Sequence, residues 1–215
     1  MLPPVAIVWP CPLSVDAYVA AGRDVAVPRP VCPRCRGAMV WWSGYRRFVR
    51  AGGSCHAIFV PRVRCGRCRA TDVVLPAFVV CSRLDVADTI GGVIEAAVGG
   101  GAGGVRPAAA RVGVPYTTAR GWLRRFCRRA GGLSVGFAAL AIELGGEVLI
   151  PVIDAAWHAV LAIRAAFDGA CSLPGWARLS RWWFASVVSG GRLLAANTNT
   201  PYLIIGRRRF MPPVP

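Results

Sequence analysis

The stretches VCPRCRG at residues 31–37 and RCGRCRA at residues 64–70 are the two sequences from which the fold of this chain is best predicted. In each, two cysteines are separated by two residues, so the chain can form a tight knuckle that directs both thiolates at one point. Two such knuckles supply the closed tetrahedral set of four thiolates that suits a structural zinc ion. We therefore predict a Zn²⁺ site formed by Cys32, Cys35, Cys65 and Cys68.

The spacer between the two cysteine pairs predicts a β-hairpin. Residues 38–50 and 56–64 are rich in β-branched and aromatic side chains, and the turn-forming sequence AGGS separates them. A third strand is expected at residues 70–76, directly after the second knuckle. A bound metal ion would substitute for the hydrophobic core that so small a sheet cannot build.

Other interpretations of these cysteines remain open. Cys55 and His56 lie in the spacer and are alternative ligands. A redox-active CPRC would need a βαβ setting and no partner pair, and this sequence meets neither condition. The chain has nine cysteines, an odd number that argues against a disulfide scaffold. The remaining ones are expected to be small, buried or half-buried residues: Cys11, Cys81, Cys127 and Cys171.

Trp41 and Trp42 follow the first knuckle. On a strand they would point to opposite faces, so one is expected to pack near the cysteines. The other, beside Tyr45, Arg46 and Arg47, is a candidate for stacking on a base or a ribose. Ordinary packing within the sheet is the alternative.

The charge of the chain favours a polyanionic partner. The 215 residues contain 26 cationic side chains, all of them arginine, against 10 acidic ones, which gives a formal net charge of +16. Nucleic acid is the usual partner of such a chain, and a membrane surface is the weaker alternative. We find no secretory signal and no run of about 18 uninterrupted apolar residues. We therefore expect a cytoplasmic, nucleoid-associated protein.

A second module is predicted to begin at residue 82. Apolar residues recur with helical spacing from residue 84 to residue 97, and Ser82 with Asp85 resembles a capping box. The sequence GGGAGG at residues 99–104 is expected to end this helix and to act as a flexible joint. It is not a phosphate-binding loop, because it lacks both the Lys-Ser/Thr pair and a preceding strand.

The sequence VRPAAARVGVPYTTARGWLRRFCRR at residues 105–129 has the pattern of a helix-turn-helix. Pro107 can start a short helix, Gly113 suits a left-handed cap, and Pro115 opens the next helix. In that helix Ala119, Trp122, Leu123 and Phe126 form the stripe expected to face inward.

The opposite stripe of the same helix is expected to contact double-stranded DNA, at base edges and at phosphates. No acidic residue occurs between residues 96 and 142, so nothing there would repel DNA. The alternative is an ordinary helical hairpin with a solvated basic face. The predicted DNA-binding residues are Tyr116, Thr117, Arg120, Arg124 and Arg128.

The order of motifs in this chain is similar to that of a known protein family. It comprises the four cysteines, then LPAF at residues 75–78, then AARVGVPYTTARGWLRRF at residues 109–126. They resemble the N-terminal DNA-binding region of some bacterial insertion-sequence transposases, and more closely an uncharacterised actinobacterial family in which a zinc ribbon precedes a helix-turn-helix. The resemblance implies a DNA-binding, transposase-related protein. The similarity to transposases stops near residue 130.

Catalysis is not expected, because a two-metal nuclease site needs several carboxylates on a mixed sheet. Asp154 and His158, four residues apart, could hold a metal, but a polar pair on one helix face is the simpler interpretation. The alternatives are a transposase or nuclease component with an unrecognised active site, and a protein-interaction adaptor. Beyond residue 130 the remaining acids are Glu143, Glu147, Asp154 and Asp168.

We predict an α+β fold, in which a small zinc-ribbon sheet precedes a mainly helical part. Helices are expected at residues 137–145, 147–167 and 176–190, the last with Trp176, Leu179 and Trp183 on one face. Three arginines at residues 207–209 form either an arm on phosphates or a solvated charge run. The predicted segments are an extended stretch 1–30, a zinc ribbon 31–80, a helix-turn-helix domain 82–131, a helical region 132–192 and a basic tail 193–215.

Overall fold

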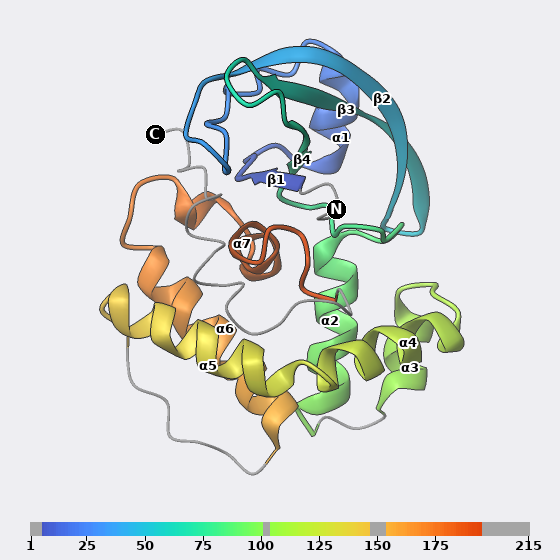
Figure 1. Cartoon of the computed structure of the whole chain (residues 1–215). Helices are drawn as coiled ribbons and strands as arrows, with labels where there is room; N and C mark the ends of the chain where they lie inside the picture. Colours follow the sequence, from blue (N-terminus) through green and yellow to red (C-terminus); the bar gives the residue numbers. More distant parts are fainter. Residues whose placement is uncertain (1–5, 101–103, 147–153, 195–215) are drawn as a thin grey trace.

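The computed structural model describes residues 6–100, 104–146 and 154–194, and shows an α+β fold with a sheet at one end and helices at the other (Figure 1). The strands β1 (Ala6–Trp9), β2 (Met39–Ala51), β3 (Ser54–Cys65) and β4 (Thr71–Pro76) form one sheet in the order β1-β4-β3-β2. The helices are α1 (Val15–Ala21), α2 (Ala87–Val98), α3 (Val105–Arg111), α4 (Tyr116–Cys127), α5 (Ala130–Glu143), α6 (Ala155–Ala170), the 3₁₀ turn η1 (Trp176–Arg178) and α7 (Arg181–Val188).

The predicted hairpin is confirmed. Strands β2 and β3 are antiparallel, and the turn between them contains Gly52 and Gly53, both with the positive φ that glycine adopts without a steric penalty. The expected third strand is present as β4, and it pairs antiparallel with β3. The register of β2 slips between Trp41 and Ser43, which marks a β-bulge.

Within the predicted extended stretch 1–30, β1 is extended, but Val15–Ala21 form the helix α1, which was not expected. Strand β1 is buried along its whole length and pairs in parallel with β4. Ser14 caps α1, where the buried Tyr18 donates a hydrogen bond to the carbonyl of Phe59 at 3.0 Å. Four apolar residues do not reveal by pattern alone that they will complete a sheet, because their partner strand lies some 65 residues further along the chain.

The predicted capping box at Ser82 and Asp85 is also wrong. Helix α2 begins at Ala87, and Ser82 has a φ of 58°. The buried carboxylate of Asp85 instead receives two hydrogen bonds from Arg50, at 2.6 and 3.0 Å. A bidentate, charge-assisted pair is stronger than a cap, so the tertiary contact decides where α2 starts.

Residues 77–86 join the sheet to the helices. Arg47 of β2 donates hydrogen bonds to the carbonyls of Val80 and Arg83, at 2.9 and 2.6 Å. From the other side, Ser186 of α7 donates to the carbonyl of Val79 at 2.8 Å. The buried apolar side chains accordingly form one continuous cluster that runs from β1 through all the helices from α2 to α7.

Helix α7 lies in the middle of the molecule and contacts α2, α6 and β1 (Figure 1). The expected single helix at 176–190 is broken, because Ser180 caps α7 by accepting a hydrogen bond from the backbone N–H of Trp183. Trp176 and Trp183 therefore do not share one helix face. Trp176 packs on Phe184, whereas Trp183 packs on Phe78.

The two other C-terminal helices differ from the prediction at their starts. Helix α5 begins at Ala130, before the expected 137–145, and α6 begins at Ala155, after the expected 147.

The polar pair considered as a metal site lies at the start of α6. Asp154 caps α6 by accepting hydrogen bonds from Ala156 and Trp157, and His158 contacts Ser134 at 2.6 Å. Asp154 and His158 thus contact different partners. Residues 147–153 and the arginines at 207–209 lie outside the described residues. Within the described ranges, no helix has the length and apolar character needed to cross a membrane.

Two neighbouring glycines in α2 allow a matched test of this packing. A Cβ atom on Gly91 would lie 1.9 Å from the indole of Trp182, whereas one on Gly92 would meet nothing within 4 Å. We expect Gly91→Ala to lower the free energy of unfolding by about 1–3 kcal/mol, because the helix pair is overpacked.

Gly92→Ala is the control, and should raise the same free energy by about 0.5–1 kcal/mol, because alanine favours a helix. Urea unfolding followed by circular dichroism measures both. Equal effects of the two substitutions would contradict the close approach of α7 to α2.

Candidate metal centre and basic helix

The four cysteines predicted as ligands lie together at one end of the sheet. The first pair precedes β2, and the second pair spans the end of β3 and the turn before β4. The sulfur atoms of Cys32 and Cys68 are 3.6 Å apart, and those of Cys35 and Cys65 are 3.4 Å apart. All four sulfurs lie within 4.8 Å of one another. The predicted clustering is confirmed.

Both cysteine pairs adopt the same backbone turn. The N–H of Arg36 donates to the carbonyl of Cys32, and the N–H of Arg69 donates to that of Cys65. Each arginine follows the second cysteine of its pair and has a positive φ, 62° and 61° respectively. Such values are uncommon for residues other than glycine, and strain of this kind persists only where the surroundings impose it. The repeated turn therefore supports a shared role for the two pairs.

The arrangement suits one metal ion with a closed coordination shell. Tetrahedral bonds of about 2.3 Å from zinc to sulfur place neighbouring sulfurs about 3.8 Å apart, close to the observed separations. The backbone N–H of Cys68 points at the sulfur of Cys65 from 3.5 Å and lowers the pKa of that thiol to about 6. A thiolate is the form that binds metal. A metal ion held by all four sulfurs would have no open coordination position for a substrate, which is the arrangement of structural metal sites.

The alternative ligands are not part of this cluster. Cys55 is exposed near the tip of the hairpin, opposite Arg50, and His56 lies 3.7 Å from the carboxylate of Asp16. Among the other cysteines, Cys11 is buried and two are half-buried, but Cys127 is exposed, contrary to expectation.

Helices α3 and α4 are joined by the turn at residues 112–115. Gly113 has a φ of 64°, as the predicted left-handed cap requires, and Val114 is buried in the turn. Ala109 is buried where α3 meets its neighbours, and Pro115 occupies the cap position of α4. Helix α3 begins two residues before Pro107, which was expected to start it.

One face of α4 is buried, as predicted. Ala119, Trp122 and Phe126 are almost inaccessible to solvent, and Leu123 is half-buried. The ring of Phe126 meets that of Trp182 edge to face, with 6.5 Å between centroids. This contact fixes α4 to the central helix α7.

The opposite face of α4 is exposed and basic. Arg120 and Arg124 are one helical turn apart, and the guanidinium of Arg106 on α3 lies 5.0 Å above the ring of Tyr116. Arg125 is turned away from this face, because it donates to the carbonyl of Gly121 within its own helix. All of the predicted DNA-binding residues are exposed: Tyr116, Thr117, Arg120, Arg124 and Arg128.

Several arginines of the sheet are engaged in different ways. The guanidinium of Arg47 donates to the backbone carbonyls of Val80 and Arg83, and burial lowers its pKa. Arg62 and Arg64 instead stack over Trp42, at 5.0 and 5.6 Å from the ring centroid. Sequence reasoning missed Arg23, which stacks on Phe59 from a distant segment and carries no local signal.

Comparison with known proteins gives one partial match. The family described as "Domain of unknown function (DUF6431)" matches residues 32–103. This range starts at the first cysteine of the cluster, contains both cysteine pairs and ends after α2, so it excludes α3 and α4. No curated protein and no solved structure matches.

The cluster predicts the metal content of the protein. We expect about one tightly bound metal ion per chain in protein purified under reducing conditions, measured by mass spectrometry of the elements. Cys32→Ser should lose the ion and lower the melting temperature of the whole chain, because the sheet shares its core with the helices.

Cys55→Ser is the control and should keep the metal, since Cys55 is exposed and outside the cluster. Equal loss of metal from both variants would show that the ligands are misassigned.

Proposed function

We propose that this protein is a sequence-specific DNA-binding protein, with a sheet stabilised by zinc and a helix-turn-helix that reads the major groove. The observation that carries the proposal is the division of α4 into two faces. Its buried face is Ala119, Trp122 and Phe126. Its exposed face holds Arg120, Arg124 and the two residues at its start, and the exposed Arg128 caps its end. Such a helix is anchored on one side and free to contact a ligand on the other.

Zinc is the proposed metal because of the donor set. Four thiolates in two Cys-x2-Cys knuckles form a soft, tetrahedral site, which suits zinc or iron. A mononuclear zinc site is colourless and an iron-thiolate site is coloured, so absorption spectroscopy of the purified protein separates the two. Zinc here would hold the end of the β2–β3 hairpin against β4.

In the proposed complex α4 is the recognition helix, and α2 and α3 complete the helix-turn-helix. The N-terminal part of α4 would lie deepest in the groove, so Tyr116, Thr117 and Arg120 are assigned to base edges. Arg124 and Arg128 lie further along the helix and are assigned to phosphates. The net charge of +16 and the lack of acidic residues from 96 to 142 favour such a partner.

A role without catalysis is part of the proposal, because several acids already serve the structure. Glu95 accepts from Arg164 at 3.0 Å and from Arg181 at 2.5 Å, Asp85 binds Arg50, and Asp154 caps α6. The resemblance to the DNA-binding region of insertion-sequence transposases suggests a regulator, or the recognition component of a mobile element.

Two assays separate this proposal from its alternatives. Nicking of supercoiled plasmid in the presence of Mg²⁺ or Mn²⁺ would identify a nuclease or transposase component. Filter binding with random duplex DNA tests the adaptor alternative, in which no duplex is retained. Selection of bound sequences from a random duplex pool would then define the target site.

Substitutions in α4 should separate base recognition from phosphate binding. We expect Arg120→Ala to cost about 1–3 kcal/mol of binding free energy on the selected site and to relax specificity. Arg128→Ala should weaken binding to all sequences alike and lower the slope of log K against log salt by about one. Fluorescence anisotropy over a range of salt concentrations measures both.

Arg178→Ala, which removes an exposed arginine outside α4, is the control and should leave binding unchanged. Trp122→Ala should abolish binding together with a loss of stability, because Trp122 is buried. If Arg120→Ala, Arg124→Ala and Arg128→Ala combined leave duplex affinity and its salt slope intact, α4 is not the recognition helix.

A further inference from the structure

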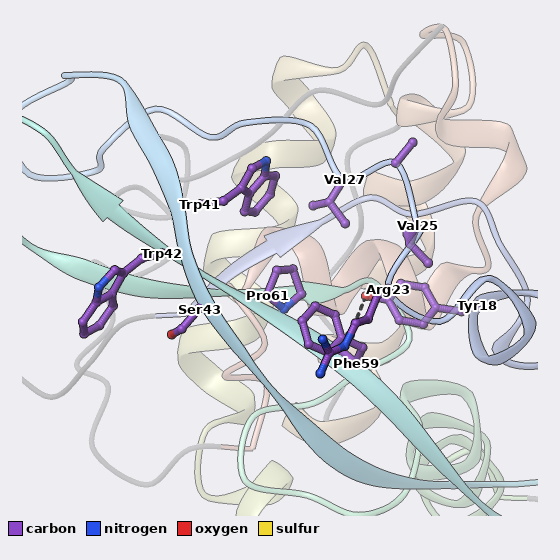
Figure 2. A pocket seen from close by; sticks show the side chains of 10 residues that line it. Tyr18, Arg23, Val25, Val27, Trp41, Trp42, Ser43, Phe59 and Pro61 are labelled. Atoms are coloured by element: carbon purple, nitrogen blue, oxygen red, sulfur yellow. Dashed lines mark hydrogen bonds between the residues drawn. The ribbon is translucent and has the colours of Figure 1, made fainter.

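A pocket of about 490 Å³ lies beside the outer hairpin of the sheet, between residues 23–27 and strands β2 and β3 (Figure 2). Its volume is within the usual range for small-molecule sites. The pocket is built from segments that are distant in sequence, and α4 does not contribute to it. It is therefore a second candidate site, separate from the proposed DNA-binding helix.

The floor of the pocket is a fixed aromatic ring. Phe59 lies directly on Gly44, where a Cβ atom would come within 2.1 Å of the ring. The guanidinium of Arg23 lies 5.2 Å from the centroid of the same ring. Tyr18 holds the backbone of Phe59 by donating to its carbonyl at 3.0 Å. Only glycine at position 44 leaves room for this arrangement.

Two exposed indoles border the pocket. Trp41 is turned toward Val27 and Trp42 lies on the other side of the β2 ribbon (Figure 2), and the two side chains are 39% and 50% exposed. Tryptophan is highly buried on average in folded proteins, so two adjacent exposed indoles mark a surface that contacts a partner. Arg62 and Arg64 stack over the ring of Trp42, so we take Trp41, the indole turned toward Val27, as the ring that a ligand would contact.

The charge around these rings is positive. Arg23 lines the pocket, and no aspartate or glutamate is among the described residues that do so. A ligand with a flat apolar ring and an adjacent anion would satisfy both the indole and the guanidinium groups.

We propose that this pocket binds an unpaired base of single-stranded nucleic acid. The base would stack on Trp41, and a neighbouring phosphate would meet Arg23, the arginine that lines the pocket. Exposed aromatic rings among cationic side chains are the usual means of binding single strands, since every base offers a π face. In a duplex the base faces are stacked on one another, so the pocket would discriminate against double-stranded DNA.

The test uses the full chain and fluorescein-labelled oligonucleotides of about 12 nucleotides, namely oligothymidylate, oligouridylate and a duplex of equal length. We expect Trp41→Ala to weaken binding of the single strands about 5- to 150-fold, as loss of one stacked base predicts. Trp41→Phe, which keeps a ring, should restore most of the affinity. Phe48→Ala is the matched control, because Phe48 is exposed on the same strand but outside the pocket, and it should bind normally.

The triple variant Arg120→Ala, Arg124→Ala and Arg128→Ala distinguishes this pocket from the proposed duplex-binding helix. It should weaken duplex binding but leave affinity for the single strands largely unchanged. Tighter binding of oligothymidylate than of oligouridylate would identify single-stranded DNA as the natural ligand, and the reverse would identify RNA. The proposal is overturned if the wild type does not bind either single strand, or if folded Trp41→Ala binds them as the wild type does. It is also overturned if Trp41→Ala changes only the oligomeric state, measured by light scattering, because the pocket is then a contact between copies of the chain.

Discussion

The rest of the structure depends on the burial of α7 between the sheet and the other helices. Trp182 lies against Gly91 of α2, so closely that any side chain at position 91 would collide with it. Ser186 of the same helix donates a hydrogen bond to Val79, next to the strands. Phe184 completes an aromatic cluster with Phe167, Trp176 and Phe137. Through these contacts a helix near the end of the described chain forms the centre of a core that begins at β1.

Two neighbouring tryptophans of α7 support the two proposed nucleic-acid surfaces. Trp182 meets Phe126 on the buried face of α4, the proposed recognition helix. Trp183 meets Phe78, and Phe78 in turn meets Tyr18, whose hydroxyl holds the floor of the pocket on the sheet. Because protein interiors are closely packed, both surfaces are held by the same rigid core. A protein that binds duplex and unpaired nucleic acid at once would need its two surfaces fixed in this manner.

The cysteine cluster lies at the end of the sheet where β2 starts and β3 ends, away from the hairpin turn. The β2–β3 hairpin is long, and most of β2 is exposed to solvent, so apolar burial along it is small. A metal ion bound by the four cysteines would join the start of β2 to the end of β3 and to the turn before β4. At the other end of the hairpin, the bidentate contact of Arg50 with Asp85 fixes the strands to the residues that precede α2. The hairpin is thus held near its tip by an ion pair, and a metal ion at the cysteine cluster would hold its other end.

The sequence by itself determined the features that depend on short-range geometry. Cysteine spacing predicts the cluster, because each knuckle is a local turn, and Gly113 predicts the turn before α4, because glycine adopts its positive φ without strain. The three- and four-residue spacing of the apolar side chains predicts which face of α4 is buried. Only the tertiary structure decided the pairing of β1 with β4, the partner of Asp85, the need for glycine at position 91 and the meeting of Arg23 with Phe59. Each of these joins residues far apart along the chain, where no local pattern records the partner and packing alone selects it.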